Sequence, residues 1–149
     1  MLQRRWADDP GALGDIRVPD ATVNDWLRLI EVVAARWPCS LGADGEQIPS
    51  PSDLNGLFAL AGPRSMLLRV RLTPLINLHA YFPDYEGIEF DFDPQELLDQ
   101  ADLDDIVDFV TSVGRALRRT VRVVVEGGDA GEMDYMRYDA DGDRIVVPD

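Results

Sequence analysis

The hydrophobic positions of this chain follow two different periods, and the first of them predicts two amphipathic helices. Apolar side chains recur every three to four residues over residues 23–37 and again over residues 103–117, which places each set on one face of a helix. Asp20 or Thr22 can cap the start of the first helix, and Pro38 ends it. The second helix begins among aspartates and ends among arginines, an order that complements the helix dipole.

The second period is the alternation of apolar and polar residues that is typical of half-buried strands. It predicts three strands joined by short turns between the helices, and three more after the second helix, the last two forming a hairpin. The expected strands cover residues 66–72, 76–82, 88–92, 121–125, 133–138 and 144–147. The resulting order, α–β–β–β–α–β–β–β, predicts an α+β fold in which both helices pack on one face of a mainly antiparallel sheet.

The remaining segments carry weaker signals. We expect residues 1–19 to form an irregular N-terminal arm, residues 38–52 to form a loop, and residues 52–60 to allow a short helix. A chain of 149 residues can bury one sizeable core, so a single domain over residues 1–149 is expected. The sequence shows neither a signal peptide nor the ~20 apolar residues that a membrane span requires, which favours a cytoplasmic protein.

Charge restricts the classes of partner that this chain can bind. It has 28 acidic residues against 14 arginines, with no lysine, and a formal net charge of -14. Such a negative field opposes contact with nucleic-acid phosphates and anionic lipid headgroups, so neither nucleic acid nor a membrane is an expected partner. One cysteine and one histidine exclude a disulfide framework and a Cys/His zinc site within one chain. We therefore expect no metal and no cofactor.

The three-strand meander predicts a polar row on the sheet face that points away from the helices. If residue 72 pairs with residue 76, and residue 82 with residue 88, then Arg69, His79 and Asp91 lie side by side across three strands. Such a row can place a general acid or base for a small hydrolase or isomerase, with the carboxylate keeping the imidazole charged. A solvated face with opposite charges paired across strands is the alternative interpretation.

Two further motifs favour structural roles. Cys39 follows the end of the first helix, where the helix dipole raises the pKa of a thiol, and this argues against a reactive thiolate. The segment from Asp139 to Asp143 resembles part of a calcium-binding loop in composition. It lacks the distal glutamate and the flanking helices of such a loop, so it predicts a hairpin turn.

Acidic and aromatic residues are interleaved in the second half of the chain. Residues 76–149 hold 6 arginines and 19 acids, a net charge of -13. Acids around exposed tyrosines suit the capture of a basic protein, because the charges steer the encounter and the aromatic rings anchor the contact. An acidic surface that only keeps the protein in solution is the alternative. The candidate partner-binding residues are Tyr81, Asp84, Tyr85, Glu86, Glu89, Asp91 and Asp93.

The stretch GIEFDFDPQELLDQADLDDIVDFVTSVGRALRRTVRVVVEG, followed by MDYMRYD, resembles small acidic proteins of GC-rich bacteria, some of which are immunity proteins that neutralise secreted polymorphic toxins. The resemblance covers residues 87–138 and lies in the succession of strand, acidic helix start, Gly-Arg-Ala-Leu helix end and strand. It implies a non-enzymatic inhibitor that binds a cognate toxin domain, often a basic nuclease. A structural subunit of a larger assembly is a third functional hypothesis.

Overall fold

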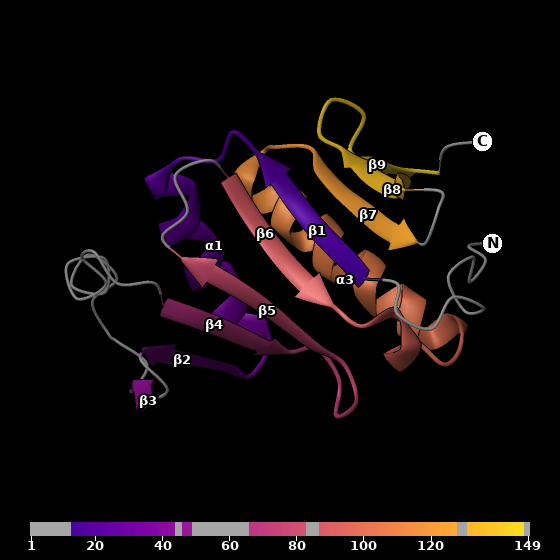
Figure 1. Cartoon of the computed structure of the whole chain (residues 1–149). Coiled ribbons are helices and arrows are strands. Elements are labelled where there is room, and N and C mark those ends of the chain that lie inside the picture. The colour runs from indigo at the N-terminus through magenta and orange to yellow at the C-terminus, as the bar shows by residue number, and fades with distance from the viewer. Residues whose placement is uncertain (1–12, 44–45, 49–65, 83–86, 128–130, 148–149) are drawn as a thin grey trace.

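The computed structural model describes residues 13–43, 46–48, 66–82, 87–127 and 131–147, and their elements form one sheet with helices on one side (Figure 1). The elements are β1 (Leu13–Pro19), α1 (Val23–Arg36), β2 (Cys39–Ala43), β3 (Glu46–Ile48), β4 (Met66–Arg71), β5 (Asn77–Phe82), β6 (Gly87–Phe92), the 3-10 helix η1 (Pro94–Glu96), α3 (Gln100–Leu117), β7 (Val121–Gly127), β8 (Gly131–Asp139) and β9 (Arg144–Val146). The strands of the described residues are arranged in the order β3-β2-β4-β5-β6-β1-β7-β8-β9, and each neighbouring pair is antiparallel. The predicted α+β class is confirmed.

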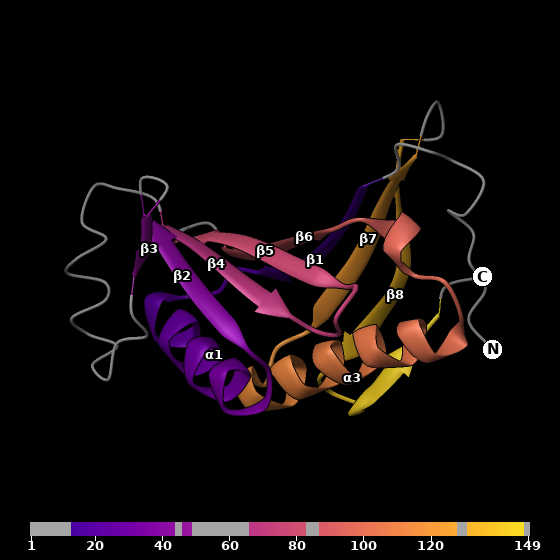
Figure 2. The ribbon, with the colours of Figure 1, turned by 90° about the horizontal axis from the view of Figure 1, so that it is seen from below.

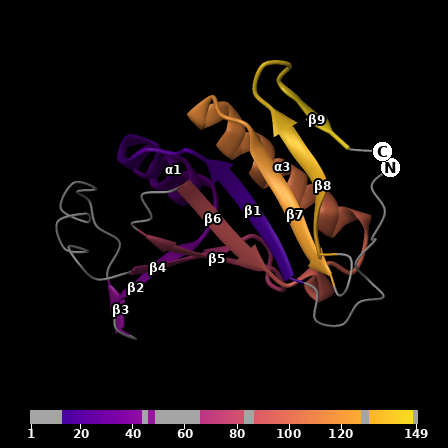
Figure 3. The same cartoon turned by 45° about the horizontal axis from the view of Figure 1, so that its top comes forward.

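Both α-helices lie on the same side of the sheet, as predicted (Figure 2). They contact each other, and α3 also contacts the three strands at the β7–β9 end of the sheet (Figure 3). We call the sheet face that the helices cover the inner face, and the opposite one the outer face. No helix in the described part of the chain is long and apolar enough to cross a membrane.

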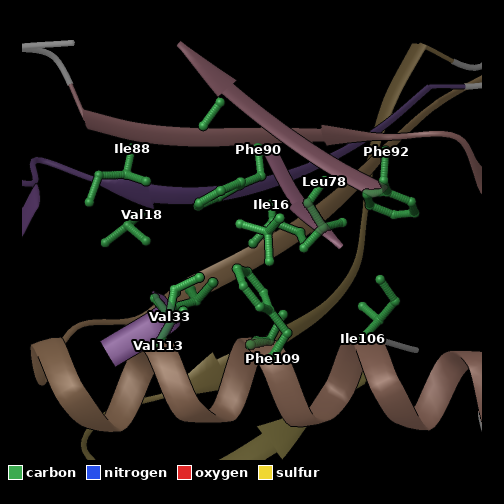
Figure 4. Close-up of a cluster of buried hydrophobic side chains, with 14 of the residues drawn as sticks. Ile16, Val18, Val33, Leu78, Ile88, Phe90, Phe92, Ile106, Phe109 and Val113 are labelled. Atoms are coloured by element: carbon green, nitrogen blue, oxygen red, sulfur yellow. The ribbon is translucent and has the colours of Figure 1, made fainter. Parts of the chain in front are cut away.

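The core fills the space between the helices and the inner face (Figure 4). Phe109 of α3 lies at its centre and meets the ring of Phe90 edge-on at a centroid distance of 5.3 Å. The apolar residues that alternate with Arg69, His79 and Asp91 along the three meander strands are all buried: Leu68, Val70, Leu78, Ala80, Phe90 and Phe92. The alternation of the sequence therefore identified the buried side of all three meander strands correctly.

The two α-helices begin with reciprocal side-chain caps. Of the two candidate caps of α1, Thr22 takes the role, and it forms a capping box with Asp25. The same Asp25 carboxylate accepts a hydrogen bond from Arg119 Nε at 2.8 Å, which joins the start of α1 to the chain just after α3. Asp99 and Asp102 form the corresponding box at the start of α3. Several of the acidic residues thus hold helix ends in place.

The prediction of an irregular arm over residues 1–19 is wrong for residues 13–19, which form β1 between β6 and β7. Ile16 and Val18 reach the core, while Asp15 and Arg17, which alternate with them, face outward. This is the alternation of a half-buried strand, but it spans only two apolar residues and is framed by glycine, aspartate and proline. Residues 1–12 lie outside the described residues.

The prediction of a loop over residues 38–52 is also wrong in part, because β2 and β3 occupy residues 39–43 and 46–48. These strands extend the sheet beyond β4 and are short and rich in small and polar residues, so the alternation of Cys39 and Leu41 with Ser40 and Gly42 is too brief to indicate a strand. The short helix considered for residues 52–60 lies outside the described residues.

Candidate functional site

The polar row predicted from the meander is present on the outer face. Arg69 lies opposite His79 in the β4–β5 ladder, and His79 lies opposite Asp91 in the β5–β6 ladder. Both registers are those predicted from the pairing of residues 72 with 76 and 82 with 88. The row is outward because the residues that alternate with it on β4 and β5 are buried in the core.

The junction between β5 and β6 is much narrower than the predicted meander implied. Among the described residues its ladder contains one pair, His79 and Asp91, whereas the β4–β5 and β1–β6 ladders contain six pairs each. The two strands cross at an angle and separate towards the end of β5 (Figure 1). We call this junction, at His79 and Asp91, the β5/β6 seam. It divides the sheet into a block of β2–β5 and a block that contains β6, β1 and β7–β9.

His79 is a hydrogen-bond acceptor in this arrangement. The Nε–H of Arg69 donates to His79 Nε2 over 3.2 Å, so that this ring nitrogen carries no proton. Burial, together with the positive charge of Arg69, lowers the pKa of His79. The expectation that a carboxylate keeps the imidazole charged is therefore wrong, because the cation on β4 contacts the ring directly.

A third carboxylate that the sequence did not bring to this site comes from β1. Asp15 lies opposite Asp91 in the β1–β6 ladder, and its residue surface is only 5% exposed. The carboxylate oxygens of Asp15, Glu89 and Asp91 lie within 4.8 Å of one another, and this is the one such group in the described part of the chain. The alternation of Asp15 and Arg17 with two apolar residues is the sequence signal that would have placed Asp15 on this face.

Arg17 supplies positive charge within this carboxylate group. Its Nη2 lies 3.0 Å from Asp15 Oδ2, and its Nε lies 3.6 Å from Glu89 Oε1. Burial and the neighbouring Asp15 charge raise the pKa of Glu89, and Arg17 acts in the opposite direction. Since a guanidinium is already paired with this group, we assign none of these carboxylates as metal ligands.

The outer face carries both signs of charge rather than a uniform negative field. Arg122 of β7 pairs with Asp134 of β8 beside the Asp15–Arg17 pair. Arg69 and Arg71 are exposed on β4, on the other side of His79. Strands β1, β4 and β7 thus supply arginines that the local sequence around β6 lacks.

Four of the seven candidate partner-binding residues lie in the described part of the chain. Tyr81 is 62% exposed at the end of β5, and Glu89 and Asp91 are exposed on β6. Asp93 is also exposed, but its carboxylate accepts the backbone N–H of Gln95 at 2.9 Å and begins η1. The other three, Asp84, Tyr85 and Glu86, lie outside the described residues.

Carboxylates also crowd together where η1 leads into α3. Burial and the nearby Asp93 charge raise the pKa of Glu96. Burial, followed by the charges of four neighbouring aspartates, raises the pKa of Asp105 in the same way; these are Asp102, Asp108, Asp104 and Asp99. The negative potential of this region is therefore only partly compensated, although Arg36 pairs with Asp108 at 2.7 Å.

The structure supports the unreactive interpretation of Cys39. Burial raises the pKa of its thiol to about 11, and the Sγ donates to the carbonyl oxygen of Trp37 at 3.4 Å. Cys39 lies opposite the buried Val70 and packs against the core, whereas His79 is on the outer face. A Cys–His pair is therefore impossible, because the sheet separates the two side chains.

The segment from Asp139 to Asp143 forms the predicted hairpin turn between β8 and β9. Asp143 accepts hydrogen bonds from Arg115 Nε at 2.8 Å and from the Tyr138 hydroxyl at 2.5 Å. The carboxylate that would be central to a calcium loop instead joins the turn to α3.

No family model, curated protein or solved structure matches this chain. The resemblance of residues 87–138 to immunity proteins therefore stays a prediction. The arguments about function rest on the geometry and charge described above.

Proposed function

We propose that this chain is a non-enzymatic, cytoplasmic binding protein that captures a basic protein partner, in the manner of an immunity or inhibitor protein. The observation that carries the proposal is the exposure of Tyr81, at 62%, on a sheet face shared with the acidic residues of β6. A large exposed aromatic ring beside carboxylates combines an anchor with charge complementarity.

The negative region of η1 and α3 adds to this proposal. This region follows directly after β6, and the chain has no arginine from residue 72 to residue 114. These partly compensated carboxylates attract a basic partner from a distance, which accelerates association. The resemblance to acidic immunity proteins also favours a basic protein as the partner.

The hydrolase or isomerase hypothesis draws less support from the geometry. A general base needs a free lone pair on the imidazole, and the Nε2 lone pair of His79 is engaged with Arg69 at 3.2 Å. Cys39, the sole thiol, lies on the other face of the sheet. The hypothesis of a structural subunit would be favoured by a stable homo-oligomer in solution.

The test begins with affinity capture from a lysate of the source organism at low and high salt, followed by titration of the purified partner. Tyr81→Ala should weaken the partner's Kd at least tenfold, which corresponds to about 1.4 kcal/mol. Because the side chain is largely exposed, the variant should keep the thermal stability of the parent chain.

Leu75→Ala is the matched control. Leu75 is 61% exposed in the turn at the other end of β5, about 20 Å along the strand from Tyr81. Its loss removes a similar exposed apolar side chain and should leave the Kd unchanged. Equal Kd values for the two variants and the parent chain would contradict the proposed surface, and the absence of any captured basic protein would contradict the function.

A further inference from the structure

We propose that His79 is a pH-sensitive contact that exchanges partners across the β5/β6 seam. In its neutral form it accepts a hydrogen bond from Arg69 within its own block of the sheet. In its protonated form it releases Arg69 and pairs with the carboxylates of β6. The inference concerns the conformation of the isolated chain and goes beyond the proposed binding function.

The first step of this exchange follows from the chemistry of the Arg69–His79 contact. A neutral imidazole has one nitrogen that accepts and one that donates, whereas an imidazolium donates from both. A proton taken from solvent at Nε2 therefore replaces the Arg69 hydrogen bond of 3.2 Å with two cations in contact. The two side chains must separate.

The second step follows from the charges on the other side of the seam. Asp91 lies opposite His79, and its carboxylate is grouped with those of Asp15 and Glu89 within 4.8 Å. Arg17 forms ion pairs with Asp15 and Glu89 of this group. Cross-strand neighbours have Cβ atoms roughly 5 Å apart, so an imidazolium at His79 is within reach of these grouped carboxylates, and its positive charge would reduce their mutual repulsion.

The position of His79 makes this exchange consequential for the fold. Its residue pair with Asp91 is the whole β5–β6 ladder of the described residues. An ionic contact formed there acts at the shortest ladder of the described sheet, whereas the same contact within a six-pair ladder would change little. The contact between the two blocks should thus change when His79 is protonated.

Several other groups face His79 and titrate or carry charge nearby. They are Arg69 and Arg71 from β4, Asp91 and Glu89 from β6, and Asp15 and Arg17 from the next strand, while Asn77 and Tyr81 flank it on β5. Burial and Asp15 raise the pKa of Glu89, so this carboxyl also changes charge on acidification. A variant that lacks only the imidazole is needed to separate the two.

The chain offers a direct measurement, because His79 is its only histidine and gives a single set of imidazole resonances. The full chain, labelled with 15N, is titrated by NMR from pH 8.5 to pH 4.5. At high pH the proton should reside on Nδ1, with Nε2 unprotonated. Arg69→Gln should raise the midpoint of the titration, and Asp91→Asn should lower it, since these changes remove the repulsive and the attractive charge respectively.

Arg71→Gln is the control for Arg69→Gln, because it removes the same charge from the same strand and face without touching the ring. It should shift the midpoint less than Arg69→Gln does. The amides of Ala80 and Phe90, which flank the seam, should move with the His79 midpoint in the parent chain but not in His79→Gln. The amides of Val121 and Val123 on β7 serve as the reference.

Each alternative outcome would overturn the inference. A proton on Nε2 at high pH would rule out the hydrogen bond from Arg69. Equal midpoint shifts from Arg69→Gln and Arg71→Gln would show that His79 senses the net charge of β4 and not a direct contact with Arg69. If the amide shifts of Ala80 and Phe90 do not follow the His79 midpoint, protonation of His79 does not change the contact between the two blocks. None of these measurements involves a partner, so they succeed or fail independently of the proposed function.

Discussion

Gly114 permits a close contact between α3 and the sheet, and its replacement by alanine should destabilise the fold. A Cβ at this position would lie 2.6 Å from Cε1 and 2.8 Å from Cγ of Tyr138, too close for carbon atoms. Tyr138 is 2% exposed and its hydroxyl is bonded to Asp143, so the ring cannot move aside freely.

The size of the effect can be worked out from three contributions. Overpacking of a core contact costs about 1–3 kcal/mol, and a displaced Tyr138 hydroxyl loses a hydrogen bond worth about 1 kcal/mol. Alanine gains about 1 kcal/mol over glycine in a helix interior. The net loss for Gly114→Ala is therefore about 1–3 kcal/mol, measured as the free energy of unfolding in urea.

The sign of the effect should reverse when the tyrosine ring is removed. In a Tyr138→Leu background the clash is relieved, so Gly114→Ala should be neutral or should stabilise the chain by up to about 1 kcal/mol. Gly142→Ala is the control, since its Cβ would meet the flexible Arg144 side chain at 3.2 Å and Asp139 Oδ2 at 3.4 Å, without a severe clash. An equal loss from Gly114→Ala in both backgrounds would refute the steric reasoning.

Three further predictions concern the helix ends, the thiol and the histidine. Asp25→Ala removes the α1 capping box and the 2.8 Å contact with Arg119, so it should lower the free energy of unfolding by about 2 kcal/mol. A double-mutant cycle with Arg119→Ala should give a coupling of about 1 kcal/mol. Replacement of the exposed Glu31 by alanine is the control and should change the free energy of unfolding little. Because burial raises the pKa of the Cys39 thiol to about 11, a disulfide reagent at pH 8 should label the folded chain far more slowly than the unfolded one; equal rates would contradict this. Burial and Arg69 lower the pKa of His79 in the folded chain, so the unfolded chain binds that proton more readily and stability is lost as the pH falls through about 6.5. His79→Gln should flatten the unfolding free energy against pH below about pH 7, and an unchanged slope would show that other groups dominate.

The elements that the sequence predicted well are those whose pattern is long and local. Residues 23–37 and 103–117 carry four or five turns of one helical face, and the two helices of the structure occupy them closely. The meander register was also predictable, because short turns fix which residues lie opposite one another. By contrast β1 shows only Ile16 and Val18 in alternation, and its place between β6 and β7 depends on pairing with residues at least 68 positions away.

The same distinction explains what was predictable at the candidate site. Arg69, His79 and Asp91 belong to consecutive strands, so their alignment followed from the local sequence. The carboxylate group did not, because Asp15 arrives from β1 and brings Arg17 with it. The direct contact between Arg69 and His79 could not be predicted either, since the register determines which residues are neighbours but not which neighbour a side chain contacts.

The distribution of charge suggests how the proposed binding would divide between association and dissociation. On β6, Glu89 is paired with Arg17, so its field is partly compensated at a distance. At the start of α3, burial and then the charges of four neighbouring aspartates raise the pKa of Asp105, with no cation among the described residues acting against them. Long-range steering depends on net charge, whereas residence time depends on the desolvated contact. Replacing Asp104 and Asp105 by asparagine should therefore slow association and reduce its salt dependence, while Tyr81→Ala should mainly accelerate dissociation. Stopped-flow binding of the captured partner would separate the two, and an unchanged association rate in the aspartate variant would place the steering charges elsewhere.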